Sequence, residues 1–207
     1  MPGCTGDHVP GLTDAFVERA CRDGLTLVIG TGSVAAVNLG GLLHELASTD
    51  PGPTAVILTE AAQRFVTPAA LRHLGRCPVL TRESLAPTLQ PLHVWLSDVA
   101  RRVLVYPASA GFMARAATGA ADDLAATTLL CATGIPTLLV PSMHPRMWAS
   151  RLVQHNVRRL QENGAHVLDT RDGTAPHITE VAATLAALTR THLRAGLPGP
   201  EKEEQRT

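Results

Sequence analysis

The sequence predicts a single α/β domain built on a doubly wound parallel sheet. Short, almost purely apolar runs recur along the chain, as expected for parallel strands that are buried on both faces. Segments with helical periodicity separate these runs, and such alternation is typical of a parallel sheet. The length of 207 residues suits one domain of this kind.

The predicted strands are apolar runs that stop at a glycine, a proline or a polar residue, and they cover 25–29, 54–58, 103–106, 136–140 and 167–168. In a parallel sheet their carboxyl ends meet at one edge, which is where such folds bind ligands. Most of the motifs discussed below directly follow a predicted strand. We therefore expect a site at this edge.

The predicted helices fill the intervals between the strands, and they cover 12–22, 33–46, 68–74, 92–101, 109–118, 122–132, 145–163 and 178–193. Thr67 and Pro68 are suited to be the N-cap and the first residue of one helix. Gly24 and Gly164 follow two others in the position that favours glycine after a helix end. Asp122 is expected to cap the helix that begins beside it.

These elements predict three segments. Residues 1–24 form an N-terminal segment with a short helix, 25–194 form the main domain, and 195–207 form a tail. The tail is rich in Gly, Pro, Lys and Glu and is predicted to be disordered.

Composition excludes several classes of function. The formal net charge is zero and aromatic residues make up 3% of the chain, so neither a basic field nor a stacking platform favours nucleic acid. No apolar run approaches the roughly 20 residues of a membrane span, and no signal peptide is evident. The four cysteines include no Cys-x-x-Cys pair and are expected to be thiols. We expect a cytoplasmic protein with no membrane partner and no metal site.

A glycine-rich turn follows the first predicted strand and opens the first helix of the main domain. In Gly30-Thr31-Gly32-Ser33 the glycines allow a ligand to approach the backbone, and a helix N-terminus suits phosphate. Ala35 stands where a dinucleotide fingerprint needs glycine, and no lysine follows as in a Walker loop. The turn favours a mononucleotide, and a plain strand-to-helix turn remains the alternative.

Further segments occur in an ordered series behind this turn: Leu92-His93-Val94-Trp95-Leu96, Pro107-Ala108-Ser109-Ala110-Gly111, Gly119-Ala120-Ala121-Asp122-Asp123-Leu124 and Pro141-Ser142-Met143-His144-Pro145-Arg146-Met147-Trp148. Together with Gly32-Ser33-Val34-Ala35-Ala36, this series resembles the homo-oligomeric flavin-containing cysteine decarboxylases. The resemblance spans about residues 25 to 170. It implies a flavoprotein fold and a flavin cofactor, FMN with FAD possible. It also implies a homo-oligomer, a trimer or a dodecamer, with flavin between subunits.

The resemblance assigns a role to each matching residue. It makes His93 the catalytic residue, and imidazole can accept a proton at neutral pH. The residues that it implies for the cofactor are Gly30, Thr31, Gly32, Ser33, Val34, Thr59, Phe65, Pro107, Ala108, Ser109, Ala110 and Gly111. The residues that it implies for the substrate are Met143, His144, Met147 and Trp148.

This chain departs from the family pattern at several of these positions. Gly111 and His144 stand where the family has Asn, Phe112 stands where it has Thr, and Ala61 stands where it commonly has a polar residue. His144 keeps hydrogen-bonding ability and is a candidate contact for a terminal carboxylate. The missing amides leave open a second interpretation, a non-catalytic flavin-binding partner subunit.

A further departure bears on the reaction. Phosphopantothenoylcysteine decarboxylases carry a cysteine in a later flap, whereas 168–177 contains none. Without that thiol the reaction would stop at the oxidised enethiol, as in the peptidyl-cysteine decarboxylases of lantibiotic and linaridin-like biosynthesis. The sequence therefore suggests oxidative decarboxylation of a precursor peptide's C-terminal cysteine to an aminoenethiol, on the way to an aminovinyl-cysteine ring. A phosphopantothenoylcysteine decarboxylase-like enzyme of coenzyme A synthesis is the alternative. A flavin prenyltransferase fits less well, because its usual first loop is absent.

Overall fold

The computed structural model describes residues 12–84, 91–170 and 172–195. Within these residues six parallel strands form one sheet in the order β3-β2-β1-β4-β5-β6. Their bounds are Leu25–Gly30 (β1), Thr54–Leu58 (β2), Val79–Leu80 (β3), Ala100–Ala108 (β4), Thr137–Pro141 (β5) and His166–Val167 (β6). The predicted doubly wound sheet is confirmed. Residues 1–11 of the predicted N-terminal segment lie outside the described residues. The same is true of residues 196–207 of the predicted tail.

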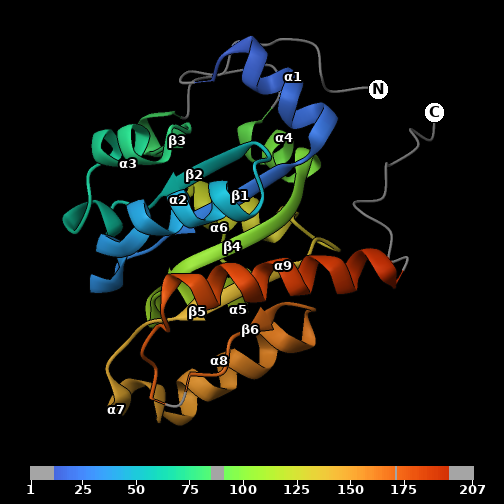
Figure 1. Ribbon diagram of the computed structural model, residues 1–207. Coiled ribbons are helices and arrows are strands. Elements are labelled where there is room, and N and C mark those ends of the chain that lie inside the picture. The colour runs from blue at the N-terminus through green and yellow to red at the C-terminus, as the bar shows by residue number, and fades with distance from the viewer. Residues whose placement is uncertain (1–11, 85–90, 171, 196–207) are drawn as a thin grey trace.

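Helices cover both faces of the sheet (Figure 1). Their bounds are Asp14–Asp23 (α1), Leu39–Thr49 (α2), Pro68–Gly75 (α3), Leu92–Val99 (α4), Ala110–Thr118 (α5), Leu124–Cys131 (α6), Pro145–Trp148 (α7), Arg151–Glu162 (α8) and Ile178–Arg194 (α9). In the described part of the chain, three short 3-10 helices, η1 to η3, cover Val34–Asn38, Ala62–Arg64 and Arg82–Ser84.

The core has two parts, one on each side of the sheet. On one face, buried residues of α1, α4, α5, α6 and α8 pack against Leu27 and Ile29 of β1. On the other face, α2, α3 and α9 pack against Val28. This alternation along β1 follows from the two-residue period of a strand, and all six of its residues are buried.

The chain leaves β1 and β4 in opposite directions. After β1 it enters α2 on one face, whereas after β4 it enters α5 on the other. Since β1 and β4 are neighbours, their carboxyl ends flank the point where the winding reverses. Crevices for ligands form at such a point. The loops after β1 and β4 are therefore the expected location of a binding site.

Several predicted boundaries are corrected. The predicted helix 33–46 begins as the 3-10 helix η1, and its α-helical part starts only at Leu39. The predicted helix 145–163 is two helices, because the chain turns at Ser150, where the amide of Gln154 caps the Trp148 carbonyl at 2.8 Å. β4 begins at Ala100, inside a predicted helix. The two-residue β3 is too short to give a periodic signal.

One of the predicted N-cap residues is confirmed and another is corrected. The Thr67 hydroxyl accepts a hydrogen bond from the Ala70 N–H at 3.1 Å, as expected for an N-cap. The cap of α6 is Asp123 rather than Asp122, because the Asp123 carboxylate accepts from the Ala126 N–H at 2.7 Å. Cys21 is disulfide-bonded, which corrects the expectation of a thiol there, whereas Cys77 and Cys131 are free thiols.

The amino end of the sheet is held by an ionic cluster. Asp50, which follows α2, pairs with Arg101 and Arg102 of β4, with N–O distances of 2.9 Å in both cases. The Arg102 side chain is 3% exposed and also donates from Nε to the hydroxyl of Thr26 in β1 at 2.9 Å. Although partial burial raises the pKa of Asp50, the two guanidinium groups hold it below its ordinary value.

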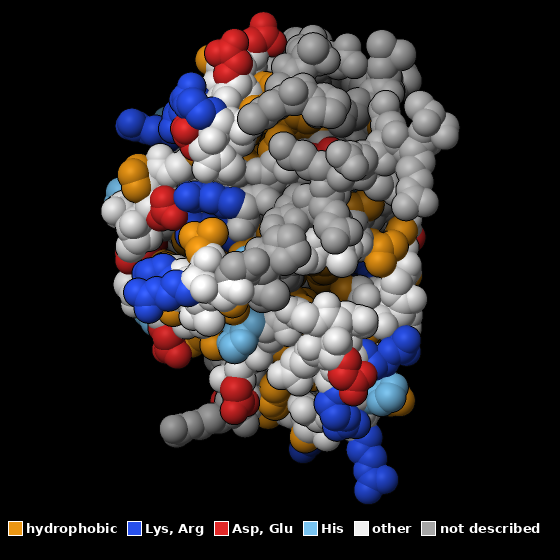
Figure 2. All heavy atoms as spheres, turned by 90° about the vertical axis from the view of Figure 1, so that its right-hand side faces the viewer, with side chains coloured by type: hydrophobic (Ala, Val, Ile, Leu, Met, Phe, Trp, Pro, Cys, Tyr) orange, Lys and Arg blue, Asp and Glu red, His pale blue; other side chains and the backbone are white. Residues whose placement is uncertain are grey.

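On the face turned to the viewer in Figure 2, the described basic and acidic side chains are interspersed rather than gathered into one field. This distribution matches the zero net charge of the chain. Among the described residues no helix is long and apolar enough to cross a membrane.

Candidate functional site

The loops after β1 and β4 are joined by the side chain of Thr31. Its hydroxyl donates to the Pro107 carbonyl at 2.6 Å and accepts from the Ser109 N–H at 2.9 Å. Thr31 is 1% exposed, so both bonds are shielded from water. Thr31 therefore holds the two loops together, and its only hydroxyl proton is already used.

A second contact joins the loop after β1 to the loop after β5. The hydroxyl oxygens of Ser33 and Ser142 lie 2.8 Å apart, and the Ser142 N–H donates to the Ala108 carbonyl at 3.0 Å. Because β4 lies between β1 and β5, the contact between the two serines passes over the end of β4. Three loops thus form one connected unit at the reversal point.

The loop after β2 packs against the loop after β1. The Thr59 hydroxyl donates to the Gly30 carbonyl at 3.0 Å and accepts from the Ala62 N–H at 3.3 Å. A Cβ atom on Gly32 would lie 2.5 Å from the Cβ of Ala61. Glycine at position 32 is therefore needed for the close approach of Ala61, and that space does not serve a ligand.

The start of α5 presents small residues to the crevice. The Ser109 hydroxyl oxygen caps the helix by accepting from the Phe112 N–H at 3.4 Å, which leaves its proton for a further partner. A Cβ atom added to Gly111 would meet nothing within 4 Å. Phe112 is only 2% exposed and packs into the core, so its ring lies away from the surface.

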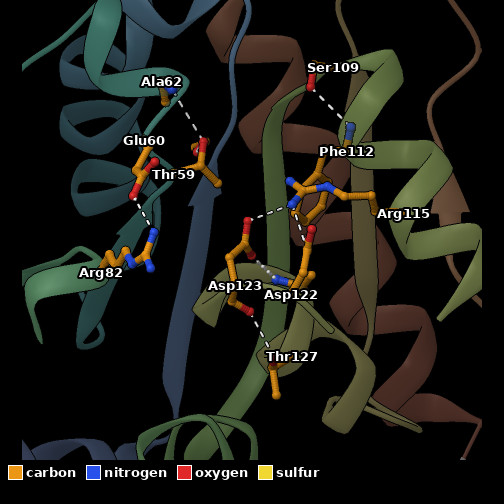
Figure 3. A network of polar contacts seen from close by, with 12 residues as sticks. Thr59, Glu60, Ala62, Arg82, Ser109, Phe112, Arg115, Asp122, Asp123 and Thr127 are labelled. Atoms are coloured by element: carbon orange, nitrogen blue, oxygen red, sulfur yellow. Dashed lines mark hydrogen bonds and ion pairs between the residues drawn. The ribbon is translucent and has the colours of Figure 1, made fainter. Parts of the chain in front are cut away.

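A charged cavity of about 480 Å³ lies beside these loops. Its walls come from the carboxyl ends of β2 and β3, from α5 and from the start of α6, and the ionisable residues that line it are Glu60, Arg82, Arg115, Asp122 and Asp123. Figure 3 shows the Glu60–Arg82 pair on one wall and Arg115 with its two aspartates on the other. The cavity and the loop after β1 share Thr59 and Ala61 as neighbours.

Arg115 is the centre of the second charged group. Its Nη1 atom lies 2.7 Å from Asp122 and 2.9 Å from Asp123, and its guanidinium lies 5.6 Å from the Phe112 ring centroid. Although partial burial lowers the pKa of Arg115, the two carboxylates raise it above its ordinary value. Arg115 is thus neutralised by its own neighbours and is not set up as an anion receptor.

The loop 141–148 is packed against the segment around Gly173. The Met143 N–H donates to the Gly173 carbonyl at 2.9 Å, and a Cβ atom on Gly173 would lie 2.8 Å from the Cβ of Trp148. Gly173 also has a φ of +82°, which favours glycine. His144 caps α7, since its Nδ1 accepts from the Arg146 N–H at 3.1 Å. The loop predicted to contact substrate and the segment around Gly173 therefore form one packed unit.

His93 lies in the first turn of α4 and is half-buried. Because α4 leads into the amino end of β4, its own first turn lies toward the carboxyl ends of the strands. The catalytic role of His93 stays a prediction, because its position in α4 alone does not bring it into contact with the loops after β1, β4 and β5. Among the described residues His93 has no hydrogen-bond partner.

The structure distributes the predicted cofactor and substrate residues unevenly. Thr31, Ser33, Thr59, Pro107, Ala108 and Ser109 are brought together by the hydrogen bonds given above. Val34, Phe65 and Met147 are 68%, 42% and 48% exposed, so none of these three is enclosed within the chain. Exposed apolar side chains of this kind are available for contact with a ligand or a neighbouring subunit.

Sequence reasoning did not select Ser142 or the five charged residues of the cavity as site residues. Ser142 lies in the segment 141–148, but its contact is with Ser33, 109 residues away in the sequence. No local pattern predicts a contact over that separation. The Gly-x-Ala-Asp-Asp-Leu segment was the one available signal for the cavity, and it pointed to Asp122 and Asp123 without their partner Arg115. In the described part of the chain no group of three or more His, Cys, Asp or Glu residues could hold a metal ion.

Comparison with known proteins places these features in a family. A family model described as Flavoprotein matches residues 18–190. The coenzyme A biosynthesis bifunctional protein CoaBC of Mycobacterium tuberculosis (strain H37Rv) is 38% identical over 148 residues, which is 71% of this chain and 35% of that protein. The chain therefore spans about a third of the length of the curated relatives it matches.

Solved structures give the same picture. TvaF, an FMN-dependent cysteine decarboxylase from thioviridamide biosynthesis, superposes with a TM-score of 0.71 and 28% identity, over 81% of this chain and 98% of TvaF. The peptidyl-cysteine decarboxylase EpiD superposes with a TM-score of 0.69 and 25% identity, over 79% of this chain and 98% of EpiD.

Proposed function

Because this chain belongs to the flavoprotein family, we propose that it is an FMN-dependent decarboxylase that acts on the C-terminal cysteine of a precursor peptide. The observation that carries the proposal is the connected unit of three loops at the β1–β4 reversal. Its members are the residues on which the resemblance to cysteine decarboxylases rests. TvaF and EpiD, two structural neighbours of this chain, are described as cysteine decarboxylases.

The donor set fits a flavin mononucleotide. Ser33 and Ser109 offer hydroxyl groups, and the open space at Gly111 would let a flat ring lie against the backbone. Thr31 and Thr59 would act by fixing the loops, since their protons are committed to Pro107 and Gly30. Bound FMN would supply the two-electron oxidation of the cysteine side chain.

The protein's own side chains would manage the proton and the peptide end. His93 would accept the thiol proton, which an imidazole can do near neutral pH. The Nδ1 of His144 accepts a hydrogen bond, so in the neutral ring the proton sits on Nε2. That N–H would donate to the peptide's terminal carboxylate, while Met147 and Trp148 would provide an apolar wall for the side chain.

The proposal includes a homo-oligomer. Val34, Phe65 and Met147 are exposed although each was predicted to contact a ligand, and a neighbouring subunit would cover them together with FMN. Sedimentation of the purified protein should give a trimer or a multiple of it. A monomer with full activity would contradict this part of the proposal.

The decisive experiment is incubation of the purified protein with FMN and short peptides ending in cysteine, followed by mass spectrometry. We expect the loss of CO2 together with two hydrogen atoms, and no change in the same peptides ending in serine. His93→Ala should lower kcat/KM by about a hundredfold or more and leave FMN bound. His155→Ala, which removes an exposed histidine of α8, is the matched control.

A second candidate is supported by the sequence relatives. CoaBC is a coenzyme A biosynthesis protein and is 38% identical to this chain over the matched region, so the alternative substrate is phosphopantothenoylcysteine. Loss of CO2 alone from that compound, with no reaction of cysteine peptides, would favour this candidate. Tight FMN binding with no CO2 from either substrate would favour a non-catalytic partner subunit.

A further inference from the structure

A second cavity lies around the amino end of β5, away from the loops of the candidate site. Its volume is about 610 Å³, which is typical of a pocket for a small molecule. Its walls come from the end of α5, from α6 and the turn into β5, from the end of α8 and from the second half of α9. The larger apolar side chains of these walls belong to Leu129, Leu130, Ile135, Leu139, Leu160 and Leu188.

The ionisable side chains of this second cavity are all basic. Among the described residues that line it are Arg159 of α8 and His192 of α9, and no aspartate or glutamate. The charged cavity beside the candidate site is the opposite case, because Arg82 and Arg115 there already pair with carboxylates. The second cavity therefore offers apolar surface together with basic groups that no acidic wall residue neutralises.

His192 contributes an unused polar atom. Its Nε2 is buried and has no hydrogen-bond partner within the described part of the chain, whereas buried polar atoms normally have one. Leu188 precedes His192 by four residues in α9, so the two side chains share one face of the helix. An apolar group and an unsatisfied imidazole nitrogen are thus presented to the cavity side by side.

Arg159 contributes an unpaired guanidinium. None of the ion pairs of the described residues includes it. The Asn163 amide donates at 2.9 Å to the backbone carbonyl of Arg159, which leaves the guanidinium uninvolved. Arg159 is an exposed residue, so an anion can reach it from solvent. A guanidinium is well suited to a carboxylate, because its fork of N–H groups matches the two oxygens.

We infer that this second cavity binds a small organic carboxylate with an apolar chain, of the class of medium-chain fatty acids. The apolar walls contact the chain, while Arg159 and the Nε2–H of His192 donate to the carboxylate. One guanidinium and one imidazole match a singly charged carboxylate. The inference does not depend on the proposed function, because this cavity shares no lining residue with the charged cavity or with the loops after β1, β4 and β5.

The test is the binding of octanoate to the purified full-length protein, measured by isothermal titration calorimetry. We expect one octanoate per chain with a dissociation constant below about 1 mM. Octan-1-ol and octylammonium keep the chain but lack the negative charge, so they should bind at least about tenfold more weakly. Acetate keeps the charge but lacks the chain, and it should show no binding.

Two variants connect the binding to the basic residues. Arg159→Met keeps an apolar stem and removes the charge, so it should raise the dissociation constant for octanoate by about tenfold and leave that for octan-1-ol unchanged. His192→Leu should act in the same direction by about threefold or more. Arg158→Met is the matched control, because Arg158 is exposed on the same helix and does not line the cavity.

Three results would overturn the inference. Equal affinity for octanoate and octan-1-ol would mean that the basic residues do not select the ligand. Displacement of octanoate by FMN would place the bound octanoate in the flavin crevice. No binding of octanoate at millimolar concentration would mean that water or a second copy of the chain fills the cavity. These outcomes leave the decarboxylase proposal untouched, since that proposal is measured with cysteine peptides.

Discussion

The two ends of the sheet hold the same pair of strands in different ways. At the amino end, β1 and β4 are joined through Thr26, whose hydroxyl oxygen accepts from the buried Arg102, and Asp50 neutralises that arginine. At the carboxyl end they are joined through Thr31, whose hydroxyl donates to Pro107 and accepts from Ser109. One end relies on ionic groups and the other on neutral ones.

The difference separates a structural role from a binding role. An ionic cluster is satisfied by its own members, so the amino ends of β1 and β4 offer little to a ligand. The hydroxyl links between the loops after β1, β4 and β5 carry no formal charge, and Ser33, Ser142 and Ser109 still leave donors for a further partner. Substitutions in the ionic cluster should therefore change stability alone, whereas those at the carboxyl end should change stability and flavin binding together.

The largest effect on stability is expected for Asp50→Ala. The variant would leave Arg102, which is 3% exposed, without its carboxylate, and loss of one partner of a largely buried pair costs about 3 kcal/mol. Urea denaturation would measure this loss. FMN affinity should not change. Asp23→Ala removes a carboxylate from an exposed pair with Arg22, and as a control it should cost about 0.5 kcal/mol or less.

The pH dependence of that effect follows from the pKa of Asp50. The ordinary value is 3.8, and the value in the folded protein lies below it. A depressed carboxyl pKa contributes stability that is complete above the unfolded value and is lost as the pH falls through the folded value. The stability difference between the unmodified protein and Asp50→Asn should thus be constant at neutral pH and shrink only below about pH 4. A difference that already shrinks near pH 6 would point to a histidine instead.

A smaller loss, about 2 kcal/mol, is expected for Thr31→Val, because it leaves the Ser109 N–H and the Pro107 carbonyl without their hydroxyl partner. Here the FMN dissociation constant should rise as well, since the two loops are no longer joined. Thr31→Ser keeps the hydroxyl and should restore most of both properties. If Thr31→Val lowered stability but left FMN binding intact, the contrast between the two ends would not hold.

Local patterns were sufficient to predict most of the fold. The strand 54–58 was predicted with its observed bounds, because an aliphatic run between Pro53 and Thr59 leaves few alternatives. The N-cap role of Thr67 was also a local matter. Errors arose where a longer-range contact decided the outcome. The predicted helix 145–163 is interrupted between Trp148 and Arg151, where Gln154 caps the Trp148 carbonyl and Gly173 packs against the Trp148 side chain.

The site was less predictable for the same reason. A glycine-rich turn and a motif series located the loops, but they did not reveal which hydroxyls are already bonded. Thr31 and Ser33 look equivalent in the sequence, yet only Ser33 belongs to a pair with a proton to spare. The charged cavity depends on the contacts of Arg115 with two aspartates seven and eight positions away. No local sequence pattern predicts these contacts.

The smallest effect is expected at Gly111, where the family pattern has Asn. A Cβ atom there would meet nothing within 4 Å, and asparagine is slightly better than glycine inside a helix. Gly111→Asn should therefore change stability by about 0.5 kcal/mol or less, as measured by urea denaturation.

Gly32→Asn is the contrasting control at the same end of the sheet. Its Cβ would lie 2.5 Å from that of Ala61, so the loops would have to separate and both stability and FMN binding should fall. If Gly32→Asn changed neither stability nor FMN binding, the loops after β1 and β2 would be packed less tightly than their hydrogen bonds imply. Gly111→Asn could also raise kcat without altering FMN affinity. That result would mean that the absent asparagine side chain slows the reaction and that the FMN pocket itself is unchanged.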